Sequence, residues 1–192
     1  FWGFMNVYMQ TELQLFSPKI IKKYVYGFDN DELESSVGNL LRSKNKTLSI
    51  AESCSGGFAS HMITSIPGSS KYFTGSMVAY SNDIKINNLN INEKNIKKYG
   101  AVSKKVVEEM AINVRKKFNS SIGIATSGIA GPDGGSKEKP VGTVWIGISD
   151  NKVTYSKKLM LTERRDINIT LSSVGVLNML RLNLEGYRKV DR

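Results

Sequence analysis

The sequence predicts an α/β fold, a single three-layer α/β/α domain with a mixed sheet. Short apolar segments with strand character alternate with amphipathic segments of helical period, as in helices that cover both faces of a largely parallel sheet. Near the C-terminus, residues 143–149 and 152–161 are consecutive strand-like segments joined at Asp150-Asn151, which predicts an antiparallel hairpin. A hairpin beside parallel strands makes the sheet mixed.

Two helices and two strands are expected in the N-terminal half. Asp29 and Glu32 have capping-box spacing and predict a helix start. The apolar face of this helix holds Leu33, Val37, Leu40 and Leu41. Residues 47–51 predict a buried strand, and the helix after it is expected to stop before Pro67. Residues 72–80 predict another strand, whose end leads into a possible helix.

The C-terminal half continues the alternation. An amphipathic helix is expected from near Ser103, because its apolar residues recur at helical spacing. Residues 122–126 predict a buried strand, and residues 127–142 form a glycine-rich loop whose length is typical of a functional segment. After the hairpin, a final helix is expected over residues 166–184.

The length of 192 residues fits one domain, and we expect it at residues 29–186. Residues 1–28 are then an N-terminal extension or the remnant of a junction, and residues 187–192 are a tail. Cys54, the single cysteine, rules out an internal disulfide and a cysteine-based zinc cluster. With neither a signal peptide nor an apolar run of about 20 residues, a cytoplasmic location without membrane contact is expected.

The formal net charge of +10 allows nucleic acid, an anionic surface or an acidic substrate as a partner. The cations fall in short scattered groups such as Lys97-Lys98 and Arg115-Lys116-Lys117, without the interleaved aromatic residues of a base-stacking platform. A solvated surface that attracts a phosphate-bearing substrate is therefore expected, and contact with nucleic acid is not.

The segment Ala51-Glu52-Ser53-Cys54-Ser55-Gly56-Gly57 lies between a predicted strand and a predicted helix. The carboxyl ends of strands are where open α/β proteins bind ligands, and N–H groups at a helix start favour an oxyanion. Ser53 is therefore a candidate nucleophile, with a helix-capping serine as the alternative. Cys54 competes as a nucleophile, although its residue type favours a buried core position.

A base for Ser53 has few sources in this sequence. His61 is the only histidine and lies along the following helix, roughly 12 Å from Ser53 at 1.5 Å per residue, which excludes a Ser-His-Asp triad. A lysine whose pKa is lowered by desolvation is the remaining choice. Lys85 and Tyr80, from the segment Tyr80-Ser81-Asn82-Asp83-Ile84-Lys85, are candidates for base and proton relay. The alternative is a capping Asn82 followed by an exposed Lys85.

Two further segments are candidates for substrate binding. The loop that starts at Ser127 has the composition of a nest for an anion or an amide, or of a flexible surface loop. Asp133 in this loop makes no metal site by itself. Arg164 and Arg165 precede the final helix, where an arginine and the helix terminus together suit a phosphate. A plain surface arginine is the alternative.

Together these segments resemble the C-terminal domain of the CinA (competence/damage-inducible protein) family, whose stand-alone members are nicotinamide-nucleotide amidases. The resemblance covers the chain from about Tyr24 to Leu184 and rests on four blocks in the same order. The blocks are residues 51–57, Tyr80-Ser81-Asn82 with Lys85, residues 99–103, and residues 127–136 continuing through 139–144. Longer members carry a separate N-terminal nucleotide-binding domain, and residues 24–29 resemble the junction to it.

The resemblance implies hydrolysis of nicotinamide mononucleotide to nicotinic acid mononucleotide and ammonia, a step of pyridine nucleotide salvage, without a metal or cofactor. It implies Ser53 as the nucleophile, with Tyr80 and Lys85 handling protons. The implied substrate-binding residues are Ser55, Gly56, Gly57, Asn82, Ser127, Gly128, Ala130, Gly131 and Arg165, the last for the phosphate.

This chain departs from the family pattern at two places. Ser55 stands where the family has threonine, and Glu163-Arg164-Arg165 stands where it has Gly-Asp-Arg, which leaves Arg164 as an alternative for the phosphate. A homo-oligomer is expected. The competing functions are a non-catalytic nucleotide-binding module and a competence-associated accessory protein that binds nucleic acid.

Overall fold

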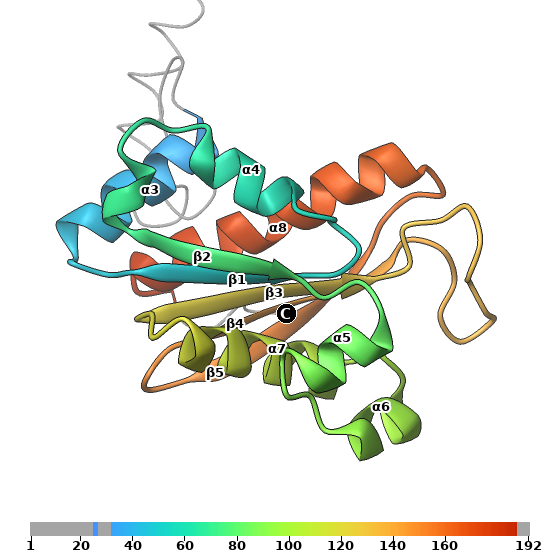
Figure 1. Cartoon of the computed structure of the whole chain (residues 1–192). Coiled ribbons are helices and arrows are strands. Elements are labelled where there is room, and N and C mark those ends of the chain that lie inside the picture. The colour runs from blue at the N-terminus through green and yellow to red at the C-terminus, as the bar shows by residue number, and fades with distance from the viewer. Residues whose placement is uncertain (1–24, 27–31, 188–192) are drawn as a thin grey trace, which may run out of the picture.

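A five-stranded mixed sheet organises the chain in the computed structural model, which describes residues 25–26 and 32–187 (Figure 1). In spatial order the strands are β2 (Phe73–Val78), β1 (Leu48–Glu52), β3 (Ile122–Gly128), β4 (Thr143–Ser149) and β5 (Thr154–Met160). β1 is parallel to β2 and β3, whereas β4 is antiparallel to both of its neighbours. The predicted mixed sheet is confirmed.

Helices cover both faces of the sheet, which makes the three layers of the predicted fold (Figure 1). One face carries α3 (Leu33–Ser43), α4 (Phe58–Thr64) and α8 (Arg165–Leu184). The other face carries α5 (Asn82–Asn87), α6 (Glu93–Tyr99) and α7 (Lys104–Lys117). A short 3₁₀ helix, η1 (Ser69–Lys71), precedes β2.

The two cores follow from the alternation of side chains along each strand. Ile50 and Ile124 pack in the core on the α8 side, whereas their neighbours Ala51 and Ala125 pack on the α7 side. The small side chains let α7 lie close to the sheet. At Gly123 a Cβ atom would lie only 2.2 Å from a backbone oxygen of α7, so glycine is required there.

The structure differs from the expected elements at several boundaries. α3 begins at Leu33 with Glu32 as N-cap and no side-chain cap, and Asp29 lies outside the described residues. β5 begins at Thr154 because Oδ1 of Asp150 accepts two N–H groups of the hairpin turn, which is longer than expected. α6 was not predicted, since its seven residues bury only Ile96.

Parts of the expected organisation lie outside the described residues. These are most of the N-terminal extension expected at residues 1–28 and nearly all of the tail at residues 187–192. None of the helices within residues 32–187 combines the length and the apolar composition that crossing a bilayer requires.

Candidate active site at the carboxyl edge of the sheet

Ser53 directly follows β1, and its side chain lies beside that of Lys85 from α5. Nζ of Lys85 donates a hydrogen bond of 3.0 Å to Oγ of Ser53. It also donates to the carbonyl oxygens of Ala79 at 2.7 Å and Tyr80 at 3.3 Å. Ser53 is 7% exposed and Lys85 is 2% exposed. Two groups 32 residues apart in the chain therefore meet in a buried contact.

The end of β2 and the start of α5 place Lys85 at this position. The N–H of Ala79 donates to the carbonyl of Glu52 at 2.7 Å, which holds the segment after β2 beside the end of β1. Ser81 is then the N-cap of α5, its Oγ accepting the N–H of Ile84 at 3.2 Å. The immediate start of a helix turns the chain back, so that Lys85 points toward Ser53. The exposed Lys85 that spacing alone allowed is excluded.

Burial lowers the pKa of Lys85 to about 8. The expectation that burial keeps this lysine neutral therefore holds only above about pH 8, and at pH 7 most molecules carry the ammonium form. In the neutral form the amine has two N–H groups and one lone pair. Since the carbonyls of Ala79 and Tyr80 only accept, they take both N–H groups, and the lone pair is left for the proton of Ser53.

Lys85 gives stability a pH dependence whose sign follows from the lowered pKa. The unfolded lysine keeps its proton up to a pKa of 10.5 and the folded one only to about 8, so between these values the unfolded state binds more protons. The free energy of unfolding is therefore expected to rise with pH in this window, by roughly 3 kcal/mol. Denaturant unfolding of wild type and Lys85→Met between pH 7 and pH 10.5 measures this rise as an increase in the free energy of unfolding of wild type relative to that of the variant. A difference that does not change with pH would contradict the lowered pKa.

A cavity of about 260 Å³ opens beside Ser53. Its wall combines Tyr80, Arg165, the end of β3 and the loop that follows, including the expected Gly128, Ala130 and Gly131. Cys54, which the sequence offered only as a competing nucleophile, also lines it, as do three loop residues outside the expected substrate-binding set, Ile129, Asp133 and Gly134. At Gly128 a Cβ atom would lie 2.6 Å from Cγ2 of Val144 and 3.0 Å from Sγ of Cys54, so only glycine fits this close approach.

Arg165 links the two sides of this cavity. Its Nη1 donates to the carbonyl of Gly131 at 2.9 Å, and its Nη2 donates to the hydroxyl of Tyr80 at 2.9 Å. Tyr80 is 58% exposed, and its hydroxyl bonds to this arginine and not to Ser53. Arg164 pairs with Asp166 at 2.6 Å on the exposed surface. Of the two arginines considered from the sequence, Arg165 is therefore the one that faces the cavity.

Glu52, a fully buried carboxylate that sequence reasoning did not assign, organises the loop after Ser53. It accepts the backbone N–H groups of Gly57, Ala59 and Ser60 at 2.9, 3.2 and 2.8 Å. It also accepts the hydroxyl of Ser55 at 2.6 Å. The carboxylate thereby satisfies the start of α4, where the helix dipole favours a negative charge.

These bonds change the role expected of residues 55–57. The N–H of Gly57 is bonded to Glu52, and the N–H of Gly56 donates to the carbonyl of Ser53 at 3.2 Å. Ser55 is buried against Glu52, and none of the three residues lines the cavity. Contrary to the expectation, these residues shape the loop, and the amide groups of Gly56 and Gly57 are already bonded within it.

Two other expected contacts with substrate also lie elsewhere. Ser127 is buried, and its Oγ donates to the carbonyl of Ala101 at 2.9 Å, which ties the end of β3 to the segment before α7. Asn82 is exposed in the first turn of α5, where Ser81 is the capping residue. Neither side chain lines the cavity beside Ser53.

Glu52→Gln is expected to lower the free energy of unfolding by about 2–4 kcal/mol, because an amide in place of the buried carboxylate weakens several bonds from N–H donors. Urea unfolding at pH 7 measures the change. Glu93→Gln is the matched control, since Glu93 also lies in the first turn of a helix but forms an exposed pair with Lys97. That variant should unfold almost as wild type does. Equal effects of the two substitutions would show that the buried bonds of Glu52 contribute little.

Cys54 and His61, the other candidates from the sequence, take no part in the contact between Ser53 and Lys85. Burial raises the pKa of the Cys54 thiol to about 11, so this cysteine is not a thiolate at neutral pH. His61 is exposed and stacks near Phe58. Asn168, another residue that sequence reasoning missed, is fully buried, and its Nδ2 donates to the carbonyl of Ala130 at 2.9 Å. It thus fixes the cavity loop to α8.

These features define a three-layer α/β domain with a buried serine–lysine pair beside an open cavity at the carboxyl edge of its sheet. Within residues 25–26 and 32–187, no cluster of three or more His, Cys, Asp or Glu side chains is arranged to hold a metal ion. The family model of the CinA C-terminal domain matches residues 30–184. The chain therefore belongs to the CinA family, as the resemblance indicated.

Similar proteins agree with this assignment. A CinA-like protein from Cytophaga hutchinsonii is 51% identical over 165 residues, which are 86% of this chain and 40% of that protein. A putative competence-damage inducible protein from Caldanaerobacter subterraneus is 44% identical, with 90% of this chain and 42% of that protein covered. The chain thus spans about two fifths of the length of these relatives.

Solved structures match the whole fold. A CinA superfamily protein from Klebsiella pneumoniae superposes with a TM-score of 0.78 at 25% identity, covering 80% of this chain and 96% of that one. A competence/damage-inducible protein from Agrobacterium tumefaciens gives a TM-score of 0.76 at 29% identity, covering 84% and 98%.

Proposed function

We propose that this chain is a nicotinamide-nucleotide amidase that hydrolyses the carboxamide of nicotinamide mononucleotide with Ser53 as nucleophile. The observation that supports the proposal most is the buried 3.0 Å hydrogen bond between Nζ of Lys85 and Oγ of Ser53 beside a cavity. Membership of the CinA family, to which the resemblance attaches this activity, supplies the substrate.

The first half of the reaction forms an ester. Neutral Lys85 takes the proton of Ser53 as Oγ attacks the carboxamide carbon, and the carbonyl π electrons move onto oxygen. When the tetrahedral intermediate collapses, the C–N bond breaks and the Lys85 ammonium returns its proton to the departing nitrogen. Ammonia leaves, and the acyl group remains bound to Oγ of Ser53.

The second half of the reaction restores the serine. Lys85, neutral again, takes a proton from water as the water oxygen attacks the ester carbon. Collapse of the second tetrahedral intermediate breaks the bond to Oγ, which takes the proton back from Lys85. Nicotinic acid mononucleotide leaves, and one water has replaced one ammonia.

The oxyanion of both steps needs donors, and the N–H of Gly128 is the one that we assign. The N–H of Ile129 donates to Thr143 on the β4 side at 2.9 Å. Because neighbouring residues of a strand present their backbone groups to opposite sides, the N–H of Gly128 faces the other side. Ser53 lies there, since its own N–H donates to the carbonyl of Thr126 at 3.1 Å. A preformed donor at this place suits a developing negative charge.

Arg165 is assigned to the phosphate of the substrate, because it lines the cavity at the start of α8.

Arg165→Gln is expected to raise KM for the mononucleotide roughly 10- to 100-fold with a smaller effect on kcat, since a charge-assisted bond to a distant group of the substrate is lost. Arg164→Gln, next to it on the exposed surface, should leave both constants unchanged. Steady-state kinetics with purified variants measures them, and an effect of Arg164→Gln alone would reassign the phosphate.

The activity itself is tested by ammonia release from nicotinamide mononucleotide, with nicotinamide and its riboside as controls. We expect ammonia and nicotinic acid mononucleotide in equal amounts, and much slower release from the two compounds without phosphate. Saturable binding of the mononucleotide without turnover would instead support a non-catalytic nucleotide-binding module. Salt-sensitive binding to DNA without turnover would support the nucleic-acid-binding alternative.

A further inference from the structure

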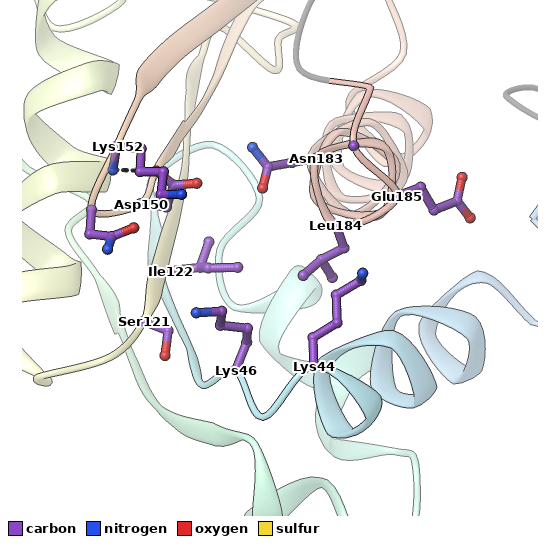
Figure 2. Close-up of a pocket in the computed structure, with 11 residues that line it drawn as sticks. Lys44, Lys46, Ser121, Ile122, Asp150, Lys152, Asn183, Leu184 and Glu185 are labelled. Atoms are coloured by element: carbon purple, nitrogen blue, oxygen red, sulfur yellow. Dashed lines mark hydrogen bonds between the residues drawn. The ribbon is translucent and has the colours of Figure 1, made fainter.

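A second cavity lies at the opposite end of the sheet from Ser53 (Figure 2). It has a volume of about 380 Å³ and lies between the hairpin turn after β4, the segment that joins α3 to β1, and the C-terminal end of α8. Lys46 in its wall precedes β1, whereas Ser53 follows this strand. The proposed amidase reaction uses no residue of this cavity.

Positive charge collects around the cavity. Lys44, Lys46 and Lys152 come from two separate connections of the chain and all line it (Figure 2). Two carboxylates are nearby, but both are already engaged. Asp150 accepts two backbone N–H groups of its own turn at 2.7 and 2.8 Å. Glu185 pairs with a buried arginine at 2.9 Å and points away from the labelled lysines in Figure 2.

Asn183 on α8 contributes a buried polar group to this cavity. Its side chain is 7% exposed and projects toward the cavity (Figure 2). Its Nδ2 atom is buried and has no hydrogen-bond partner among residues 25–26 and 32–187. A buried N–H donor costs free energy unless it reaches an acceptor. The Nδ2 of Asn183 therefore points to a ligand that supplies this acceptor.

Backbone acceptors at the end of α8 do not meet this requirement. The carbonyl oxygens of residues 181–183 accept the N–H groups of residues 185–187. The C-terminal end of α3 is closed in the same way, by N–H groups of residues 44–46. The three lysines and Asn183 thus bring three ammonium groups and one amide N–H donor to the cavity.

We propose that this cavity binds a small phosphate monoester. A phosphate carries close to two negative charges and several acceptor oxygens, which match three lysines and the Nδ2 of Asn183 better than a single carboxylate does. A volume of about 380 Å³ exceeds what a phosphate needs, and Ile122 and Leu184 supply apolar surface for the organic part. This binding site is independent of the proposed function.

Isothermal titration calorimetry at fixed ionic strength tests the site, with adenosine monophosphate, inorganic phosphate and adenosine as probes. We expect saturable binding of the monophosphate, weaker binding of inorganic phosphate, and none of adenosine. Binding of inorganic phosphate with the same affinity as the monophosphate would contradict a role for the apolar wall. The absence of saturable binding by either phosphate would overturn the proposal.

Variants locate the binding. Asn183→Leu and the double variant Lys44→Gln/Lys46→Gln are each expected to weaken binding of adenosine monophosphate at least about tenfold, because charge-assisted bonds are lost. Asn183→Leu should not lower the midpoint of urea unfolding, since its Nδ2 has no partner to lose. The matched control Lys94→Gln/Lys97→Gln on α6 makes the same change of net charge and should bind as wild type does.

Two outcomes would contradict this location. An equal loss of affinity for adenosine monophosphate in Lys94→Gln/Lys97→Gln would show that the net charge of +10 attracts the ligand without a specific site. Loss of binding in Arg165→Gln, with Asn183→Leu unaffected, would place the monophosphate in the cavity beside Ser53. The site that we propose predicts the reverse pattern.

Discussion

Ser53→Ala is expected to lower the rate of ammonia release from nicotinamide mononucleotide by at least about 10³-fold, because removal of a nucleophile abolishes the covalent route. The fold should persist. Nζ of Lys85 loses one acceptor but keeps the carbonyls of Ala79 and Tyr80, so the free energy of unfolding should change by no more than about 1 kcal/mol. A coupled ammonia assay and urea unfolding of the same preparation measure both quantities.

Cys54→Ala is the matched control for this substitution. Cys54 is the next residue and lines the same cavity, but burial raises the pKa of its thiol to about 11. We expect Cys54→Ala to keep most of the turnover of wild type. Near-normal turnover in Ser53→Ala together with loss in Cys54→Ala would transfer the nucleophile to the thiol.

Lys85→Met is expected to reduce kcat/KM by roughly 10²- to 10⁴-fold, the contribution of a positioned general base. Methionine fills similar space without a charge, so stability at pH 7 should be equal to that of wild type or higher, because no ammonium is buried. In wild type, kcat/KM should rise with pH and level off above about 8, where the amine is neutral.

Lys85→Arg tests whether Lys85 acts as a base or only through its positive charge. Arginine keeps the charge but does not lose its proton in proteins. If Lys85 acts as a base, both Lys85→Met and Lys85→Arg should show this reduced kcat/KM at every pH. Substantial activity in Lys85→Arg, or a pH profile of wild type that is flat through pH 8, would contradict the role of the amine as a base.

The fold was predictable from the sequence because its apolar patterns are regular. Residues such as Val107, Met110 and Val114 recur at helical spacing and do pack on the sheet. The order of the strands was not predictable, since no sequence pattern in residues 48–52 or 122–128 indicates that these two strands pair. α6 was missed because a short polar helix has no apolar face from which to recognise it.

The candidate site was only partly predictable. The residues themselves made Ser53 and Lys85 candidates but also allowed a capping serine and an exposed lysine, and the family resemblance favoured the catalytic roles. Glu52 and Asn168 were missed, since several of the partners of each are backbone groups that only the folded chain brings together. The same bonds explain why Gly57 was wrongly expected to bind substrate. The sequence does not show that its N–H already donates to Glu52.

The most direct test of the central claim is mass spectrometry of enzyme quenched in acid during turnover of nicotinamide mononucleotide. We predict an ester of nicotinic acid mononucleotide on the peptide that contains Ser53, formed within the first turnover and absent from Ser53→Ala. An ester on another residue, or ammonia release with no ester at any time in the first turnover, would contradict a serine nucleophile activated by Lys85.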